Sequence, residues 1–218
     1  MSISEFWSVH RGETCLIVGN GPSLRDIPLS FLEQYPTFGT NLIYKLIGFT
    51  PTYYTAVDHR VLVPLAKTLE TRFPGVPKFV PDRYVDYQAR PVYYFHHRPG
   101  DVWIGNSEGV DMLTDPGLAY VSISHVALQL AYYMGYTTML MVGMDNTGDG
   151  MHFYGDGYPL PFPDAIDLSF GMLRKGFEAA KNPRRIINLS TATQVTTIER
   201  GDWRGYDKSS RPGGLLEA

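Results

Sequence analysis

The stretch Thr14-Cys-Leu-Ile-Val-Gly-Asn-Gly-Pro-Ser23 decides the fold class. Its first half is an unbroken apolar run, which is typical of a strand buried on both faces of a parallel sheet. Gly19, Gly21 and Pro22 end that run, and residues 24–34 then carry apolar side chains at a helical spacing. The pattern predicts a strand, a tight turn and a helix, in that order.

Similar units continue along the chain. Apolar, β-branched or aromatic runs predict six further strands, at residues 37–40, 52–57, 76–80, 92–95, 138–142 and 185–189. Helical periodicity predicts helices at residues 59–73, 122–134 and 164–180, with a helical turn at 42–47. Strands that alternate with helices indicate an α/β fold with a mainly parallel sheet of about six or seven strands and helices on both faces.

The length of 218 residues fits one domain, which we place at residues 1–200, followed by a C-terminal tail at 201–218. Nineteen basic and 22 acidic residues give a net charge of −3, so we expect no nucleic-acid partner. The single cysteine excludes a disulfide framework.

The longest apolar run, residues 138–144, is far shorter than the ~20 residues of a membrane span. The N-terminus lacks the pattern of a signal peptide, so we expect a cytoplasmic protein. Fifteen tyrosines fit a homo-oligomer interface, although the sequence does not sort them into core and surface.

Polar residues at the predicted strand ends form the candidate binding site, because ligands of open parallel sheets bind at the carboxyl ends of the strands. The glycine turn lets a backbone approach a ligand, and the following helix start offers N–H groups to a phosphate. Each residue also has an ordinary reading as a turn former or helix cap. The candidates are Gly19, Asn20, Gly21, Ser23, Asn41, Asp58, Ser122 and Ser124.

A second group of candidates follows the strand at residues 138–142. Asp145 stands at the strand end, and the Gly- and Asp-rich loop at residues 146–163 contains His152 and Asp156. A carboxylate, a histidine and a flexible loop suit acid–base work or metal binding, and a loop this long is often a functional lid. A solvated loop without chemistry is the alternative.

The order of these motifs resembles a known superfamily. Val18-Gly-Asn-Gly-Pro-Ser-Leu24, Asn41, Asp58, the helix from Ser122, and Met141-Val-Gly-Met-Asp145 follow one another along the chain. Together they resemble the group that joins bacterial lipooligosaccharide sialyltransferases with MptE-like (6-hydroxymethylpterin diphosphokinase-like) proteins. The stretch from Gly143 to Asp156, with Asn188-Leu-Ser190 and Thr193, is similar to a phage- and prophage-type branch of it.

The resemblance implies a Rossmann-like domain that binds a nucleotide or nucleotide-sugar. Asn20 and Gly21 would then contact the phosphate region and Asn41 the nucleoside, while Ser122 to Ser124 would hold the phosphate or cytidine. Two departures matter. The sialyltransferases place a general-base histidine downstream of the lid, whereas no histidine follows His152 here, so His152 would replace it. Their Thr-Ser-Gly helix start is Ser122-Ile123-Ser124 in this chain.

Three functions remain open from the sequence. The first is a nucleotide-dependent transferase, most simply a sialyltransferase-like glycosyltransferase acting on an unknown acceptor. The second is an MptE-like diphosphokinase, which would need Mg²⁺ on Asp58, Asp145 and Asp156; only this alternative implies a cofactor. The third is a non-catalytic nucleotide-binding module.

Overall fold

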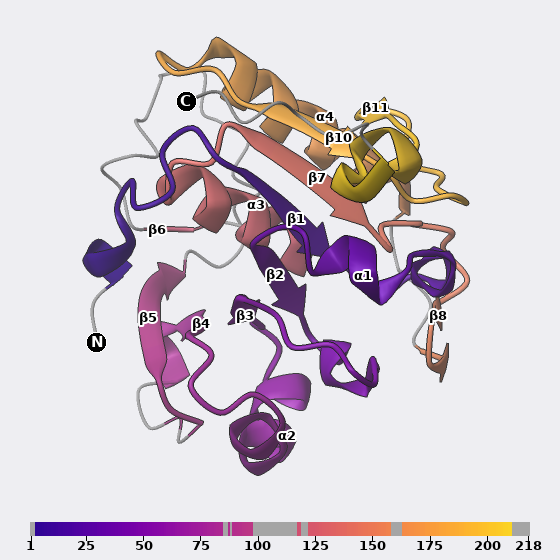
Figure 1. The fold of residues 1–218 in the computed structure, drawn as a ribbon. Coiled ribbons are helices and arrows are strands. Elements are labelled where there is room, and N and C mark those ends of the chain that lie inside the picture. The colour runs from indigo at the N-terminus through magenta and orange to yellow at the C-terminus, as the bar shows by residue number, and fades with distance from the viewer. Residues whose placement is uncertain are drawn as a thin grey trace.

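The computed structural model describes residues 3–84, 87, 89–97, 117–118, 122–157 and 163–210. In it a parallel sheet of nine strands runs in the order β11-β10-β7-β1-β2-β3-β4-β5-β6 (Figure 1). The strands are β1 (Thr14–Val18), β2 (Thr37–Thr40), β3 (Tyr53–Thr55), β4 (Lys78–Pro81), β5 (Val92–His97), β6 (Gly117–Leu118), β7 (Thr138–Val142), β10 (Arg185–Asn188) and β11 (Glu199–Arg200). The predicted α/β class and the mainly parallel sheet are confirmed; β6 and β11 are two-residue additions at the two edges.

Helices lie on both faces of this sheet. The longer ones are α2 (His59–Arg72), α3 (Ile123–Tyr133) and α4 (Pro163–Ala179), and α1 (Leu29–Leu32) is a single turn. Short 3₁₀ helices are η1 (Ile3–Phe6), η2 (Pro22–Asp26), η3 (Ile43–Lys45), η4 (Asp82–Tyr84), η5 (Trp203–Tyr206) and η6 (Lys208–Ser210).

Strand β1 shows how the two layers are made, because successive side chains of a strand point to opposite faces. Cys15 and Ile17 belong to the core that packs under α3 and α4, whereas Leu16 and Val18 belong to the core under α1 and α2. All four side chains are fully buried. The unbroken apolar run in the sequence therefore reflects burial from both sides.

The predicted helix at residues 24–34 is wrong in one respect, because the chain divides it at Pro28. The described structure has η2 before this proline and α1 after it. Pro28 has no N–H for a helical hydrogen bond, and its ring favours an extended conformation in the preceding residue. Ile27 accordingly has φ −99° and ψ 116°.

The first part of the predicted tail, as far as Ser210, is ordered against the domain. It forms η5 and η6, which pack beside α1 and the turn that follows it. Gln34 Nε2 donates to Asp207 Oδ1 at 2.8 Å, the Lys208 N–H donates to Gln34 Oε1 at 2.7 Å, and the rings of Phe31 and Trp203 lie 5.4 Å apart. Residues 211–218 lie outside the described part of the chain.

The sheet has a topological switch point between β1 and β7, which pair directly. After β1 the chain enters η2 and α1 on one face, and after β7 it leads to α4 on the other face. Chains that leave neighbouring strands in opposite directions open a crevice at the carboxyl ends of those strands, where ligands of such folds bind. None of the described helices has both the length and the apolar content that crossing a lipid bilayer requires.

Candidate functional site

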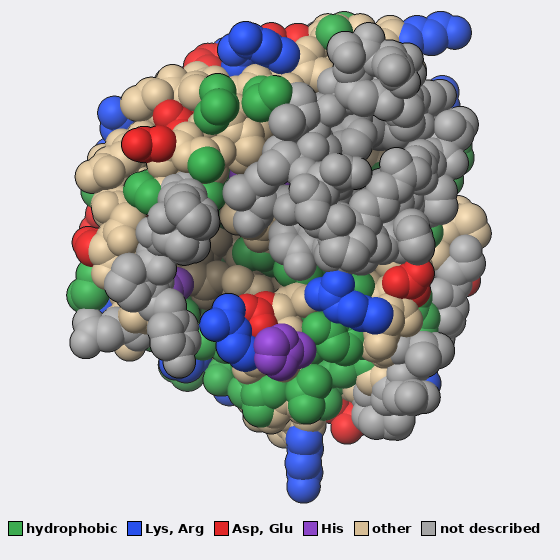
Figure 2. All heavy atoms as spheres, turned by 180° about the vertical axis from the view of Figure 1, so that it is seen from behind, with side chains coloured by type: hydrophobic (Ala, Val, Ile, Leu, Met, Phe, Trp, Pro, Cys, Tyr) green, Lys and Arg blue, Asp and Glu red, His purple; other side chains and the backbone are tan. Residues whose placement is uncertain are grey.

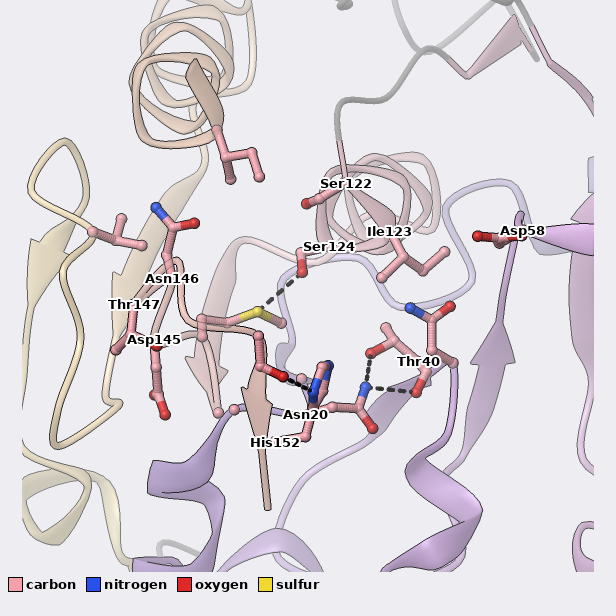
Figure 3. A pocket seen from close by; sticks show the side chains of 18 of the residues that line it. Asn20, Thr40, Asp58, Ser122, Ile123, Ser124, Asp145, Asn146, Thr147 and His152 are labelled. Atoms are coloured by element: carbon pink, nitrogen blue, oxygen red, sulfur yellow. Dashed lines mark hydrogen bonds between the residues drawn. The ribbon is translucent and has the colours of Figure 1, made fainter. Parts of the chain in front are cut away.

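A cavity of about 730 Å³ lies at this switch point. Figure 3 shows its walls, with Asn20 and Thr40 from the ends of β1 and β2, Ser122 to Ser124 from the start of α3, and Asp145 to Thr147 after β7. The predicted residues that line it are Gly19, Asn20, Gly21, Asn41, Asp58, Ser122, Ser124, Asp145 and His152. Ser23 is buried behind the wall, and the side chain of Asp156 lies outside the described part of the structure.

The glycine turn is hydrogen-bonded to the end of β7. The N–H of Gly19 donates to Val142 O at 2.9 Å, and that of Gly21 donates to Gly143 O at 2.8 Å. The next N–H, of Ser23, donates to Asp145 Oδ2 at 2.7 Å. The expectation that this helix start offers free N–H groups to a phosphate is therefore wrong, because the chain fills the position with its own carboxylate.

The carboxylate that occupies the start of η2 belongs to Asp145. Its side chain is 2% exposed, and it accepts from both the N–H and the hydroxyl of Ser23. Burial raises the pKa of this carboxyl, while the Ser23 hydrogen bonds act in the opposite direction. In this geometry Asp145 caps η2 and ties the end of β7 to the end of β1; its predicted catalytic role stays a prediction.

Replacement of Asp145 tests the capping role. D145A leaves the buried N–H and hydroxyl of Ser23 without their acceptor, so we expect a loss of about 1–3 kcal/mol in unfolding free energy. D145N has nearly the same shape but does not titrate. Both are measured by urea unfolding, with nucleotide binding measured in parallel.

The raised pKa of Asp145 predicts the direction in which the unfolding free energy changes with pH. Because the folded-state pKa of Asp145 is raised, the folded protein holds the proton more tightly than the unfolded chain, whose carboxyl titrates near 3.8. Stability from this group is therefore fully present below pH 3.8 and is lost as the pH rises through the folded-state pKa. The unfolding free energy of wild type minus that of D145N should fall between pH 4 and pH 7. A difference that rises with pH would mean that Ser23 stabilises the carboxylate more than burial penalises it.

The loop that carries Asp145 is held from the side of β10. Ser190 Oγ accepts from the Met144 N–H at 2.8 Å, and Thr193 Oγ1 donates to Met144 O, also at 2.8 Å. Asn188 Nδ2 donates to both Met144 O and Thr193 Oγ1. These residues, which the sequence grouped as one motif, therefore support the loop instead of lining the cavity.

Three asparagines, Asn20, Asn41 and Asn146, line the cavity. Asn20 Nδ2 donates to Thr40 O at 3.0 Å, and Asn146 Nδ2 donates to Pro163 O at 3.0 Å. A backbone carbonyl only accepts, so these bonds fix which end of each amide is nitrogen. The Oδ1 atoms of Asn20, Asn41 and Asn146 are buried and have no partner among the described residues.

Asn41 and Asn146 also have left-handed backbones, with φ of 46° and 53°. Asparagine adopts this conformation more readily than most residues. Asn146 was missed by the sequence reasoning, which treated it as part of the loop. Its position in the sequence could have indicated it. Asn146 directly follows the strand-end carboxylate Asp145, just as Asn41 directly follows β2.

The start of α3 is organised by His125, a second residue that the sequence reasoning missed. Ser122 Oγ lies 2.8 Å from His125 Nδ1, and the Ser122 N–H donates to the same nitrogen at 3.3 Å. Ser124 Oγ donates to Met144 Sδ at 3.0 Å. His125 is 2% exposed, which places it behind the cavity wall.

His152 lies on a small hairpin within the predicted lid. The hairpin joins β8 (Met151–His152) to β9 (Gly155–Asp156), so the described part of the lid is not a plain loop. It is docked on the glycine turn: the Phe153 N–H donates to Asn20 O at 2.9 Å, and Arg25 Nε donates to Phe153 O at 2.7 Å.

The tautomer of His152 follows from its partner. Its Nδ1 lies 2.8 Å from Gly150 O, a carbonyl that only accepts, so Nδ1 carries the hydrogen. The neutral ring then has its lone pair on Nε2. A ring that is oriented through Nδ1 and has Nε2 unprotonated has the form of a general base.

Asp58 lies on the far side of the cavity from Asp145 (Figure 3). It caps α2 by accepting from the Arg60 N–H at 2.8 Å, and it forms an ion pair with the Arg60 guanidinium at 2.5 Å. These contacts with Arg60 lower the pKa of the Asp58 carboxyl. Figure 2 shows the molecule from the side opposite to Figure 1. On this face the surface is hollowed, and charged and histidine side chains lie below the hollow.

Asp58 and Asp145 do not form a magnesium site together. The strands they follow, β3 and β7, are separated by β1 and β2, so the two strand ends lie roughly 14 Å apart. Mg²⁺ holds its oxygen ligands at about 2.1 Å. Across the described residues, no group of three or more His, Cys, Asp or Glu side chains is arranged to hold a metal ion.

Comparison with known proteins adds a likeness of fold. The sequence matches no protein-family model and no curated protein. The structure is similar to that of the sialyltransferase CstII from Campylobacter jejuni in complex with a substrate analogue, cytidine-5'-monophosphate. The TM-score is 0.55 at 14% sequence identity, over 88% of this chain and 86% of that one. At this identity the likeness shows that the two chains share a fold over most of their lengths.

Proposed function

We propose that this chain is a nucleotide-dependent transferase, and that it is a glycosyltransferase of the sialyltransferase-like type with a nucleotide-sugar donor. The observation that carries the proposal is the cavity at the switch point of the sheet, where the Asn20 and Asn41 carbonyl oxygens are buried and find no partner among the described residues. A buried acceptor without a donor is costly, and hydroxyl or amino groups of a nucleoside or sugar would satisfy it.

In this proposal, different walls of the cavity bind different parts of the nucleotide-sugar donor. Asn20 and Asn41 would meet the nucleoside and sugar, and the start of α3 would meet the phosphate. Transfer forms a bond from the acceptor oxygen to the anomeric carbon and breaks the bond from that carbon to the phosphate oxygen. The nucleotide leaves with the bonding electrons, and the acceptor proton passes to His152 Nε2.

The similarity to a structure that holds cytidine-5'-monophosphate supports a cytidine nucleotide as the first ligand to test. The departure at Ser122-Ile123-Ser124 keeps the base identity open within this proposal. The MptE-like diphosphokinase reading requires carboxylates that share a magnesium ion, and the separation of Asp58 from Asp145 gives it less support.

A thermal-shift panel tests the proposal. The ligands are CMP, CDP, UDP, GDP, ADP, ATP and CMP-sugars, each with and without Mg²⁺. A ligand that binds only the folded state stabilises it by RT ln(1 + [L]/Kd), which is about 2.7 kcal/mol at a hundredfold excess over Kd. We expect a shift without metal from one nucleotide or nucleotide-sugar.

Two asparagine variants test whether the shift in melting temperature comes from binding in the cavity. N20A should lose most of the shift relative to its own melting temperature, whereas N182A, at an exposed asparagine beyond α4, should keep it. A shift that needs both ATP and Mg²⁺ would favour the diphosphokinase instead. If no ligand shifts the melting temperature, both enzyme readings fail and a module with another ligand takes their place.

A further inference from the structure

Two helices, η2 and α3, begin at the cavity region. The side chains that cap them differ in charge. At η2 the capping group is the Asp145 carboxylate, which accepts from the Ser23 N–H. At α3 it is the imidazole of His125, which accepts from the Ser122 N–H. The Asp145 cap places a negative charge at the start of η2. Whether the start of α3 can bind an anion therefore depends on the charge of His125.

The hydrogen bonds of His125 fix its tautomer. Ser169 Oγ donates its one hydrogen to Ile166 O at 2.7 Å, so at 2.7 Å from His125 Nε2 it acts as an acceptor. Nε2 therefore carries the hydrogen of the ring, and Nδ1 has the lone pair that accepts from Ser122. Every ring nitrogen is satisfied in the neutral form.

The surroundings of His125 keep it neutral. Its ring stacks on Phe170 at 4.1 Å, and burial lowers the pKa of the imidazole to about 3. This capping box differs from the usual one, in which Glu or Gln at the third helical position accepts from the cap N–H. A glutamate there would bring a negative charge to the wall of the cavity.

Among the described residues, the next two N–H groups of α3 remain without an acceptor. Within the described part of the chain, no acceptor is in hydrogen-bond reach of the N–H of Ile123 or Ser124, and both residues line the cavity. The partial positive charge of an eleven-residue helix is concentrated at this end. Asn20 is 9% exposed and lines the same cavity, and its Oδ1 has no partner in the part of the chain that the structure describes, which independently indicates a ligand.

We propose that His125 is a positioning residue that caps α3 without charge and so reserves the Ile123 and Ser124 N–H groups for an anionic part of the ligand, a phosphate or pyrophosphate. The inference rests on the proposed function for the identity of the ligand. Its anion site is distinct from the glycine turn, which Asp145 already fills.

Inorganic pyrophosphate tests the anion site without assuming a nucleotide. In ¹⁵N-labelled protein, the amide resonances of Ile123 and Ser124 should shift on titration, whereas that of Ser23 should stay in place. Shifts at Ser23 and Gly21 without shifts at Ile123 and Ser124, or no shifts at any of them, would overturn the inference. Because this probe carries no nucleoside, its result stands even if no nucleotide binds and the proposed function fails.

Three variants test His125 itself, with CMP and cytidine as paired probes. H125Q keeps a neutral acceptor for the Ser122 N–H and should retain most of the wild-type preference for CMP over cytidine. H125L keeps an apolar filling but loses the acceptor, and it should lower CMP affinity about tenfold with little effect on cytidine. A residue that only packs would give the reverse order, with H125L better than H125Q.

H125E separates charge from geometry, since glutamate can also accept from the cap N–H. At pH 8 it should lower the CMP-to-cytidine affinity ratio about tenfold or more. A folded H125E protein with the wild-type ratio would overturn the role of neutrality. If H125E does not fold, the rank order of H125Q and H125L decides alone.

Discussion

An H152N variant is expected to fold and to bind nucleotide as wild type does, yet to lose about 10²–10⁴-fold in kcat. Asparagine places its Nδ2 where His152 has Nδ1, so the hydrogen bond to Gly150 O and the form of the β8–β9 hairpin are kept. What disappears is Nε2, the atom that takes the acceptor proton in the proposed reaction. The measurement is single-turnover transfer from the donor that the thermal-shift panel selects.

His59 provides the matched control. It also lines the cavity, its side chain is 73% exposed, and it lies beside Asp58 on the opposite wall from Asp145. H59N should keep kcat within about twofold, as expected of an exposed side chain outside the chemistry. The reverse pattern, with a large loss in H59N and none in H152N, would assign the base to His59.

A G21A variant should lose about 3 kcal/mol of unfolding free energy, because overpacking at a closed site costs up to this amount. A Cβ on Gly21 would lie 2.6 Å from Asp145 Oδ2, 2.7 Å from Asp145 Cγ and 2.8 Å from Gly143 O. To relieve these contacts, the chain must give up the Gly21 N–H to Gly143 O bond or the capping of Ser23. For a chain of this length the melting temperature should fall by about 6–12 °C.

Gly205 is the control for this change. A Cβ there meets no atom within 4 Å, and its backbone is not left-handed, so G205A should stay within about 0.5 kcal/mol of wild type. If G21A melts like G205A, the glycine turn and the Asp145 loop are not as closely joined as the structure describes. Nucleotide binding by G21A, measured below its melting temperature, would then remain intact.

The strands were predictable because their signal is local. Burial of β1 and β7 from both faces leaves unbroken apolar runs, and the polar residues at their ends mark the edge of the sheet where the cavity lies. Gly19, Asn20 and Asn41 could be placed at this edge for that reason. The two-residue strands β6 and β11 and the hairpin β8–β9 are too short to leave such a pattern.

The roles within the site were less predictable. Ser23 and Asp145 are 122 residues apart and were assigned to binding and catalysis, but the hydrogen bonds between them close the turn. His125 was not singled out in the sequence, although its two ring nitrogens connect Ser122 to Ser169 across two helices. Neither pairing follows from the composition or spacing of either segment.

The sequence by itself determined the α/β class, the parallel sheet and the edge of the sheet where a ligand would bind, because side-chain periodicity and chain direction act over a few residues. Only the tertiary structure decided which N–H groups at that edge remain free. That depends on long-range partners: Asp145 reaches Ser23 across the β1–β7 pair, while neutral His125 leaves Ile123 and Ser124 unpaired within the described chain. Hydrogen-bonding groups are satisfied by whatever the fold brings near them, so their availability is a property of the packed molecule.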